Sequence, residues 1–227
     1  MKGSLSVIIP VYNEVSTIIN VISEVAHLPE VGQIIVIDDG SSDGTSDVLA
    51  GPLPGPVTVI SSEVNRGKGW AIRQALSCAS CDVVVIQDAD EEYDPAYYKK
   101  LLTPILEGGI DAAYGNRLHI SYFVRHPLHF AGNKFITILL NILNRRRLAD
   151  AATGLKMFRR KAIEGINFDS DDFEFDMELT IKMLKKGIGI RSYSIGYDPR
   201  TNKEGKKFRL RDRWGTMKAI LYYSCVN

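Results

Sequence analysis

Short apolar segments alternate with stretches of helical periodicity through the first half of the chain. The apolar segments have the length and β-branched composition of strands that are buried on both faces. Between them, apolar positions recur every three or four residues, as on the buried face of an amphipathic helix. The predicted strands are residues 5–11, 33–37, 57–60 and 82–87, and the predicted helices are residues 14–27, 44–49, 67–79 and 95–106. This order predicts an α/β fold with a mainly parallel central sheet flanked by helices.

The second half continues with less regular spacing. Residues 110–114 and 154–158 are predicted strands, and residues 173–186 form a predicted amphipathic helix. The most loop-like stretch, residues 51–56, has the length of a connector between a helix and a strand, so it marks no domain boundary. A chain of 227 residues with 45% hydrophobic residues is therefore expected to form one domain.

Two carboxylates follow the most apolar of the predicted strands. Asp88 and Asp90 come directly after residues 83–87. Ligands of open α/β sheets bind at the carboxyl ends of the strands, so both side chains are expected in the ligand crevice. Paired carboxylates repel each other and suffer desolvation, and a divalent cation that also holds a diphosphate relieves both penalties. The pair therefore predicts a metal and diphosphate site.

Two further strand-end loops are expected at the same edge of the sheet. The first contains Pro10, Tyr12 and Glu14, and the second contains Asp39. Carboxylates at these places suit a nucleobase N–H or ribose hydroxyls, and Tyr12 offers a ring for stacking. Residues 43–45 are instead expected to supply turn and helix-cap chemistry.

Several charged residues elsewhere have a candidate role in phosphate or proton chemistry. Lys68 is expected either to contact a diphosphate or to be a solvated charge. Arg117 follows a predicted strand, which places a guanidinium at the crevice edge to stabilise a leaving group. Glu174 and Asp176 are candidates for acid/base catalysis, whereas Glu178 is expected to form a helix ion pair with Lys182, four residues later.

Charge is unevenly distributed although the net charge is only +1. No acidic residue lies between positions 120 and 147, and residues 135–143 form an apolar helix face beside a polar face that includes Lys134. A core helix and a membrane-surface helix both fit this pattern. Residues 200–213 carry seven basic and two acidic residues and precede an aromatic amphipathic segment, residues 214–223. This order predicts contact with anionic headgroups or a phosphate-bearing acceptor, and no nucleic-acid-binding signature accompanies it.

The chain contains no stretch of about eighteen apolar residues and no signal-peptide pattern at its start. Its three cysteines do not make a disulfide framework, which is typical of a reducing compartment. We therefore expect a cytoplasmic protein that attaches peripherally to the cytoplasmic face of a membrane.

Taken together, the motifs resemble glycosyltransferase family 2, and within it the dolichol-phosphate mannose synthase-like and polyprenyl-phosphate glycosyltransferase branch. The resemblance covers nearly the whole chain. The matching segments are residues 7–14, 36–45, 65–69, 87–90, 115–117, 150–156, 173–175, 197–201 and 204–207.

This resemblance implies a GT-A fold, a GDP- or UDP-linked sugar donor and a Mg²⁺ or Mn²⁺ cofactor. It implies that residues 1–118 bind the nucleotide sugar and that residues 119–227 form the acceptor-binding, membrane-proximal half. Residue by residue, it implies nucleotide-sugar contacts from Pro10, Tyr12, Glu14, Ile37, Asp39, Asp88, Ala89, Asp90 and Arg117. It further implies acceptor-phosphate contacts from Arg200 and Lys206 and catalytic roles for Asp90, Arg117 and Arg200.

One departure from the family pattern concerns the metal. The mannose synthase pattern has glutamine two residues after the second aspartate, and this chain has Glu92 there. A third carboxylate can still bind a metal, so Asp88, Asp90 and Glu92 are the predicted ligands. Its extra negative charge means that the identity of the sugar donor follows less directly from the family resemblance.

The predicted activity is inverting transfer of a sugar from a nucleoside diphosphate to a polyprenyl phosphate. A family 2 enzyme that acts on a saccharide hydroxyl in surface-polysaccharide synthesis is the first alternative, and it would need Asp176 or Glu174 as a base. A nucleotidyltransferase and a non-enzymatic sugar- or lipid-binding module are further alternatives.

Overall fold

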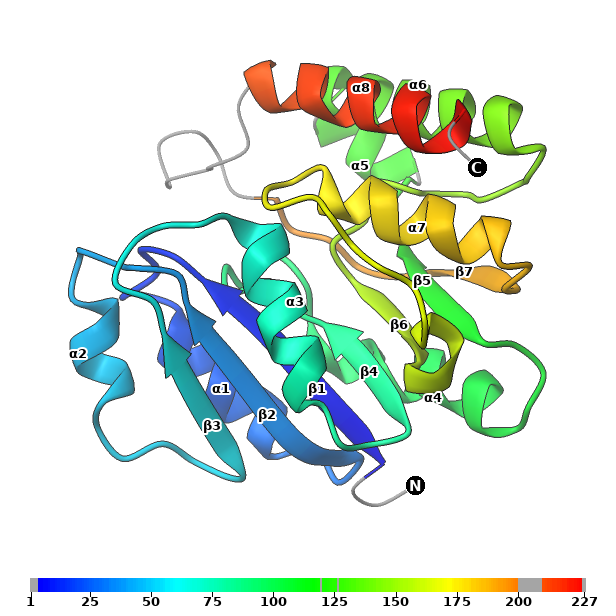
Figure 1. The fold of residues 1–227 in the computed structure, drawn as a ribbon. Coiled ribbons are helices and arrows are strands. Elements are labelled where there is room, and N and C mark those ends of the chain that lie inside the picture. The colour runs from blue at the N-terminus through cyan, green and yellow to red at the C-terminus, as the bar shows by residue number, and fades with distance from the viewer. Residues whose placement is uncertain (1–3, 119, 126, 200–209, 226–227) are drawn as a thin grey trace.

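The computed structural model describes residues 4–118, 120–125, 127–199 and 210–225 of the chain (Figure 1). In the described part, seven strands form one sheet in the order β3-β2-β1-β4-β6-β5-β7. Every pairing is parallel except the two made by β6, which runs antiparallel to β4 and β5. The strands are β1 Leu5–Val11, β2 Val31–Asp38, β3 Val57–Ser61, β4 Val83–Ile86, β5 Ala112–Asn116, β6 Lys156–Arg159 and β7 Ile190–Ser194.

Helices cover both faces of the sheet, and a further group lies beyond one of them (Figure 1). Short 3₁₀ turns occur at Pro95–Tyr97 and Arg160–Ile163. The helices are α1 Ile18–Ala26, α2 Thr45–Leu49, α3 Lys68–Cys78, α4 Tyr98–Leu106, α5 Ile120–Arg125, α6 Pro127–Asn144, α7 Phe175–Lys185 and α8 Leu210–Cys225. The predicted α/β architecture with a mainly parallel sheet is confirmed.

Alternate residues of β1 pack on opposite faces of the sheet because side chains alternate along a strand. Val7 and Ile9 join a core cluster with α1 and α4, and Ile8 joins a second cluster with α3 and α7. All three side chains are fully buried. The sheet therefore has an apolar layer on each face, as expected for strands that are apolar at every position.

Helix α7 links the sheet to the outer helices. Phe175 and Leu179 pack toward the sheet, whereas Met177 and Ile181 pack against α6 and α8 in a third core cluster. Because α7 is apolar on two sides, α6 and α8 form a separate layer over it (Figure 1). This layer carries the segments that were predicted to be amphipathic.

The bounds of the elements follow the sequence prediction closely in the first half. The predicted bounds of β1 are confirmed, whereas α1 begins later than predicted, at Ile18, since the chain first makes a turn in which Thr17 and Ile18 N–H donate to the Glu14 carbonyl. The Asp94 carboxylate accepts the Ala96 N–H at 2.8 Å, but the turn it caps is 3₁₀ and α4 starts at Tyr98.

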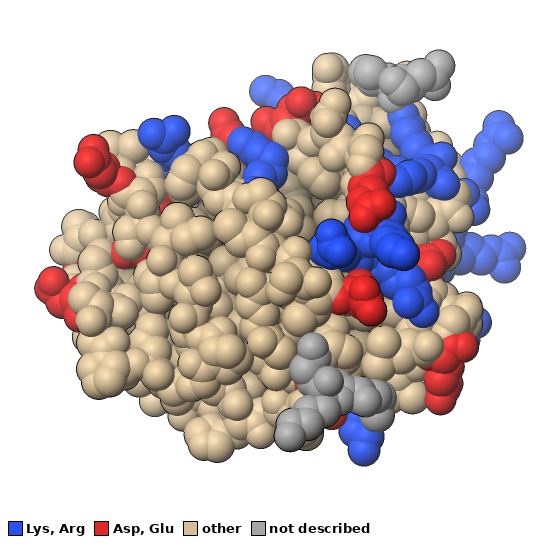
Figure 2. Space-filling view, turned by 60° about the horizontal axis from the view of Figure 1, so that its bottom comes forward, with Lys and Arg blue, Asp and Glu red and all other residues tan. Residues whose placement is uncertain are grey.

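Charged side chains are mixed in sign on the face that Figure 2 shows, where the bottom of Figure 1 is turned forward. Lys and Arg gather toward one side with Asp and Glu among them, and a broad area carries few charges. This face therefore offers no extended surface of a single charge.

None of the helices among the described residues has the length and apolar character needed to cross a membrane.

Candidate active site

A pocket of about 420 Å³ lies at the carboxyl ends of β1, β2 and β4. At one end the strand-end loops line it, including Tyr12 and Asp88. At the other end its walls come from α5, α6 and α8, with Tyr122, Asn133 and Thr216. The pocket therefore joins the edge of the sheet to the outer helical layer.

Most of the predicted donor-site residues line this pocket. Ile37 does not, because its side chain is fully buried in the core cluster under α3. The residues that the structure does bring to the pocket are Pro10, Tyr12, Glu14, Asp39, Asp88, Ala89, Asp90, Glu92 and Arg117. Arg200 and Lys206 lie outside the described residues.

The loop after β1 is held in place by the loop after β2. The Glu14 N–H donates to the Thr45 hydroxyl at 2.9 Å, and Asp43 accepts from the Thr45 hydroxyl and backbone N–H at 2.6 and 3.0 Å. The predicted turn role of residues 43–45 is confirmed, whereas the N-cap of α2 is Gly44, which has no side-chain cap hydrogen bond. Thr17 donates its hydroxyl to the Ala89 carbonyl at 2.7 Å, which connects the start of α1 to the Asp88–Asp90 loop.

Asp39 holds the segment that leads into α3. Its two carboxylate oxygens accept the backbone N–H groups of Arg66 and Gly67 at 2.9 and 2.7 Å. Burial raises the pKa of Asp39, and these two hydrogen bonds oppose the rise. Gly67 has φ +103°, and a Cβ on it would collide with the Asp171 carbonyl. Asp39 therefore shapes the pocket wall as well as facing the pocket.

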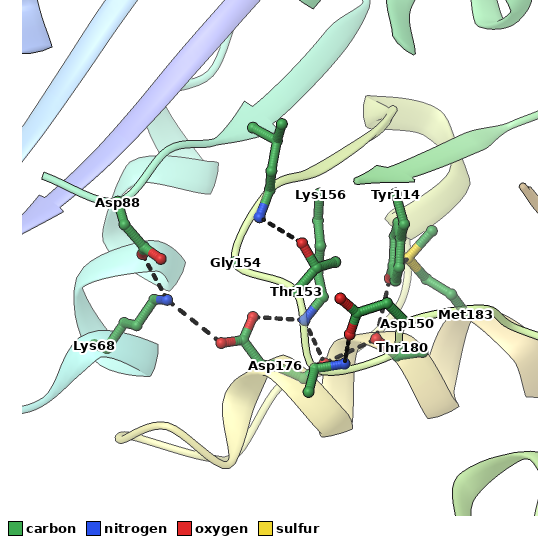
Figure 3. A network of polar contacts seen from close by, with 12 residues as sticks. Lys68, Asp88, Tyr114, Asp150, Thr153, Gly154, Lys156, Asp176, Thr180 and Met183 are labelled. Carbon is green, nitrogen blue, oxygen red and sulfur yellow. Dashed lines mark hydrogen bonds and ion pairs between the residues drawn. The ribbon is translucent and has the colours of Figure 1, made fainter. Parts of the chain in front are cut away.

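A chain of alternating charges runs inward from Asp88 (Figure 3). The Lys68 ammonium lies 2.7 Å from Asp88 Oδ1 and 3.4 Å from Asp176 Oδ2. Lys156, which is fully buried, donates to Asp176 Oδ1 at 2.6 Å and to the Asp176 carbonyl at 3.0 Å. Only 14% of the Lys68 side chain is exposed, so the solvated-charge interpretation of this lysine is wrong.

Ion pairing and burial act against each other in this chain of charges. Burial disfavours the ammonium of Lys68, but the carboxylates of Asp176 and Asp88 outweigh it and raise the pKa of Lys68. At Asp176 burial is likewise outweighed, here by Lys156 and Lys68, and the pKa falls. At Lys156 burial prevails and lowers the pKa. Asp176 is therefore a stably ionised carboxylate rather than a proton acceptor.

The predicted three-carboxylate metal set is not assembled as such. The Tyr197 hydroxyl donates to Glu92 Oε2 at 2.5 Å, while Asp90 Oδ1 accepts the Glu92 N–H at 3.3 Å. Among the described residues, no three His, Cys, Asp or Glu side chains gather closely enough to hold a metal ion. Asp88 and Asp90 remain as the carboxylates at the end of β4, with Glu92 turned to Tyr197.

Arg117 is held rigidly in the pocket wall. Its Nε and one terminal nitrogen donate to Asp150 Oδ2 and Oδ1 at 2.8 and 3.1 Å. Its guanidinium carbon lies 5.0 Å from the ring centroid of Tyr197 and 6.0 Å from that of Tyr93. Asp150 is fully buried and Arg117 is 5% exposed, so this cation is fixed in place before any ligand binds.

The sequence interpretation assigned no role to four residues of this site, namely Tyr93, Asp150, Lys156 and Tyr197, although all but Tyr93 lie in segments that carry the family resemblance. Lys156 left a signal, since it stands beside Leu155 and Met157 in a predicted buried strand and a lysine there needs a carboxylate partner. Tyr93 left no comparable signal.

Glu178 and Glu174 of the α7 region have different partners in the structure. The Glu178–Lys182 pair is confirmed at 2.5 Å, and Glu178 also accepts the N–H groups of Asp169 and Ser170 at 2.8 Å each. The Glu174 carboxylate lies against Gly215 of α8 instead.

The sequence profile described as Glycosyl transferase family 2 matches residues 6–166, so the chain belongs to that family. The predicted family resemblance is thereby confirmed, and the nucleotidyltransferase alternative is excluded.

Curated relatives include a hexosyltransferase, a monophosphomannose synthase and a hexose transferase. The chain is 31% identical over 224 residues to the low-salt glycan biosynthesis hexosyltransferase Agl6 of Haloferax volcanii, covering 96% of this chain but 53% of that protein. It is 29% identical to the polyprenol monophosphomannose synthase of Mycolicibacterium smegmatis, covering 86% and 77% of the two chains. It is 27% identical to a dolichyl-phosphate hexose transferase of H. volcanii, covering 88% and 85%. The chain thus spans about half the length of some curated relatives.

Solved structures share the fold. Glucosyl-3-phosphoglycerate synthase of Mycobacterium tuberculosis, crystallised with Mn²⁺, UDP and phosphoglyceric acid, superposes with a TM-score of 0.77 at 22% identity, covering 99% of this chain and 79% of that one. Its complex with Mn²⁺, UDP-glucose and phosphoglyceric acid gives 0.75. The predicted GT-A fold is confirmed.

Proposed function

We propose that this glycosyltransferase moves a sugar from a nucleoside-diphosphate sugar to a polyprenyl phosphate. One observation carries the proposal: a single pocket runs from the strand-end carboxylates to helices whose outward side chains are apolar. A charged donor suits the first end and a lipid acceptor suits the second. The names of the polyprenol monophosphomannose synthase and the dolichyl-phosphate hexose transferase support the same acceptor class.

Asp88 and Asp90 would hold a divalent cation, Mg²⁺ or Mn²⁺. The residues fit such an ion, because Mg²⁺ and Mn²⁺ prefer oxygen ligands and both carboxylates line the same pocket. A bound cation supplies charge stabilisation for the departing diphosphate. Pro10, Tyr12 and Glu14 would then face the nucleoside.

Arg117 would stabilise the anions that meet in the pocket. The guanidinium is already oriented by Asp150, so little reorganisation accompanies the reaction. Bringing a phosphate acceptor toward a diphosphate donor requires cations between them, and Arg200 and Lys206 are proposed to add to that charge at the acceptor side.

A phosphate acceptor needs no strong base because its oxygen is already anionic. This matters because neither candidate base is well placed. Asp176 is ionised and bound between Lys156 and Lys68, and the Glu174 carboxylate lies against α8. The alternative of transfer to a saccharide hydroxyl therefore lacks a suitable base among the predicted candidates.

The outer helices would hold the enzyme at a membrane surface. Of the fourteen large apolar side chains that are exposed in the described residues, ten lie on α5, α6 and α8. The ten are Phe123, Val124, Leu128, Phe135, Ile138, Ile142, Leu143, Trp214, Leu221 and Tyr222. We propose peripheral attachment through this apolar surface.

Transfer assays with the full chain test the proposal. The donors are UDP-glucose and GDP-mannose with Mn²⁺ or Mg²⁺, and the acceptors are a polyprenyl phosphate, the matching polyprenol without phosphate, and a soluble saccharide. We expect labelled sugar in the organic phase only with the polyprenyl phosphate, and none with Asp90→Ala. Transfer to the saccharide but not to the lipid phosphate would contradict the proposal.

A further inference from the structure

The contact between Lys68 and Asp88 places a positive charge where the proposed metal site begins. Lys68 Nζ is 2.7 Å from Asp88 Oδ1 and 3.4 Å from Asp176 Oδ2, so Asp88 is the nearer of its two carboxylate partners among the described residues. A divalent cation at Asp88 would face this ammonium directly, and two cations on one carboxylate repel each other. Repulsion between the two cations therefore favours a shift of Lys68 away from Asp88 when a metal binds.

Asp176 provides the position for that move. Its Oδ2 already lies 3.4 Å from Lys68 Nζ, on the opposite side from Asp88 (Figure 3). Its Oδ1 is occupied by Lys156, whose side chain is fully buried and which also donates to the Asp176 carbonyl. Asp176 is thus held in one orientation with Oδ2 directed at Lys68.

The charges of the four residues are balanced. Two carboxylates, Asp88 and Asp176, alternate with two ammonium groups, Lys68 and Lys156. Without a metal, Lys68 neutralises Asp88. When Asp88 binds a divalent cation, a shift of Lys68 to Asp176 keeps each ammonium in contact with a carboxylate, although the two lysines then share the single negative charge of Asp176.

We propose that Lys68 competes with the divalent metal for Asp88, and that the buried Lys156–Asp176 pair is a positioning device that accepts Lys68 when the metal binds. This inference rests on the proposed metal site. It makes the metal affinity depend on residues that do not touch the metal. Lys156 and Asp176 are positioning residues, and they act through Lys68.

Titration of Mn²⁺ into the full chain, with free Mn²⁺ measured by EPR, tests the inference without any turnover. Lys68→Met removes the competing cation, so we expect Mn²⁺ to bind about tenfold more tightly than to wild type. Lys68→Arg keeps the charge, and we expect an affinity close to wild type. Asp176→Asn removes the alternative partner of Lys68, so we expect binding about tenfold weaker.

Two further variants separate this role from a structural one. Asp176→Asn leaves the Lys156 ammonium buried with a neutral partner, so the double variant Lys156→Met/Asp176→Asn removes that ammonium as well. We expect the double variant also to bind Mn²⁺ more weakly than wild type while it melts near the wild-type temperature. Lys182→Met removes the same charge from an ion pair remote from Asp88, and its Mn²⁺ affinity should stay within twofold of wild type.

Each outcome decides the question. Unchanged or weaker Mn²⁺ binding by Lys68→Met, or wild-type binding by the double variant, overturns the inference and leaves the proposed metal site intact. If neither the wild type nor Lys68→Met binds Mn²⁺ alone or with UDP or GDP, the metal part of the proposed function fails and this inference fails with it.

Discussion

Gly154 allows the Asp88 carboxylate to pack directly against the chain before β6. A Cβ at this position would collide with Asp88 Oδ2 and come within 3.1 Å of the Tyr93 ring. The Gly154 N–H donates to the Tyr93 hydroxyl at 2.8 Å, which keeps the backbone close to the ring. Small size at residue 154 is therefore a requirement of the site.

Gly154→Ala is predicted to displace Asp88 while the protein stays folded, because the end of an aspartate side chain can move more easily than the backbone. We expect transfer to fall at least about tenfold and Mn²⁺ affinity to fall with it, since one carboxylate leaves its place. Gly189→Ala is the control, because no atom lies within 4 Å of a Cβ there. Full activity of Gly154→Ala would show that the position of Asp88 is not critical.

Asp176 gives a prediction for the pH dependence of stability. Its pKa in the folded protein is lowered, so its contribution to the free energy of unfolding is complete above the unfolded-state pKa of about 4 and is lost as the pH falls through the folded-state pKa. Asp176→Asn should therefore destabilise the protein by about 3–5 kcal/mol at pH 7. The difference from wild type should shrink below about pH 4. Denaturant unfolding at pH 7 and pH 3 measures it, and a pH-independent difference would refute the assignment.

The sequence could predict which residues face the pocket but not how their charges pair. The strand-end positions of Asp39, Asp88 and Asp90 follow from the rule that ligands bind at the carboxyl ends of strands. The partner of Asp88 is Lys68, and the partner of Lys68 on its other side is Asp176, which is 108 residues away. No local spacing encodes such a pairing. It arises only when α3, β6 and α7 pack together.

Helix α6 has two polar side chains, Thr137 and Asn141, turned inward. Thr137 is 1% exposed and accepts the Ala151 N–H at 3.1 Å, and Asn141 makes two hydrogen bonds with the backbone of Leu148 at 2.8 and 2.9 Å. Ile138 and Ile142 are 46% and 69% exposed instead. A core helix would show the reverse arrangement, so the two alternatives left open by the sequence are no longer equal.

Ile138→Asp/Ile142→Asp is predicted to reduce binding to anionic vesicles several-fold without unfolding the protein, because both side chains face outward. A buried residue of the same helix provides the comparison. Ile136 is 4% exposed, and Ile136→Asp should unfold the protein or lower its melting temperature sharply. Ile19→Asp/Val64→Asp changes two exposed residues far along the chain and should leave vesicle binding unchanged. Sedimentation with vesicles and circular dichroism measure the two effects. Unfolding of the first double variant would assign this face of α6 to the core.

The elements of the first half could be predicted because their patterns are local. Uninterrupted apolar runs such as 83–86 mark central strands, and the bounds of β1 follow from the same kind of signal. Strand β7 was missed. It lies at the edge of the sheet, and Arg191, Ser192 and Ser194 interrupt its apolar pattern. The antiparallel course of β6 likewise depends on its neighbours rather than on its own residues.

The whole molecule places its charged chemistry and its apolar surface at the two ends of one pocket. The carboxylates belong to the parallel half of the sheet, whereas α6 and α8 form a layer outside α7 (Figure 1). The proposed lipid acceptor, with its chain in the membrane, would thus present its phosphate to the pocket. The proposed orientation puts the outer helices, and not the face in Figure 2, against the membrane.

Membrane binding by this surface is predicted to depend on salt. Lys134 and Lys218 are exposed on α6 and α8, and no acidic residue occurs between positions 120 and 147 or after 212. Each basic residue near an anionic surface contributes about 1 kcal/mol, and salt screens this attraction over about 10 Å at 0.1 M and about 3 Å at 1 M. The fraction bound to anionic vesicles should therefore fall as the NaCl concentration rises, and neutral vesicles should retain little protein.

Two double variants test whether this surface carries the attraction. Lys134→Gln/Lys218→Gln should weaken binding at low salt by about tenfold or more. Lys99→Gln/Lys161→Gln makes the same charge change at exposed sites outside the outer helices and should not weaken binding. Equal losses from both double variants would mean that net charge, and not this surface, governs attachment.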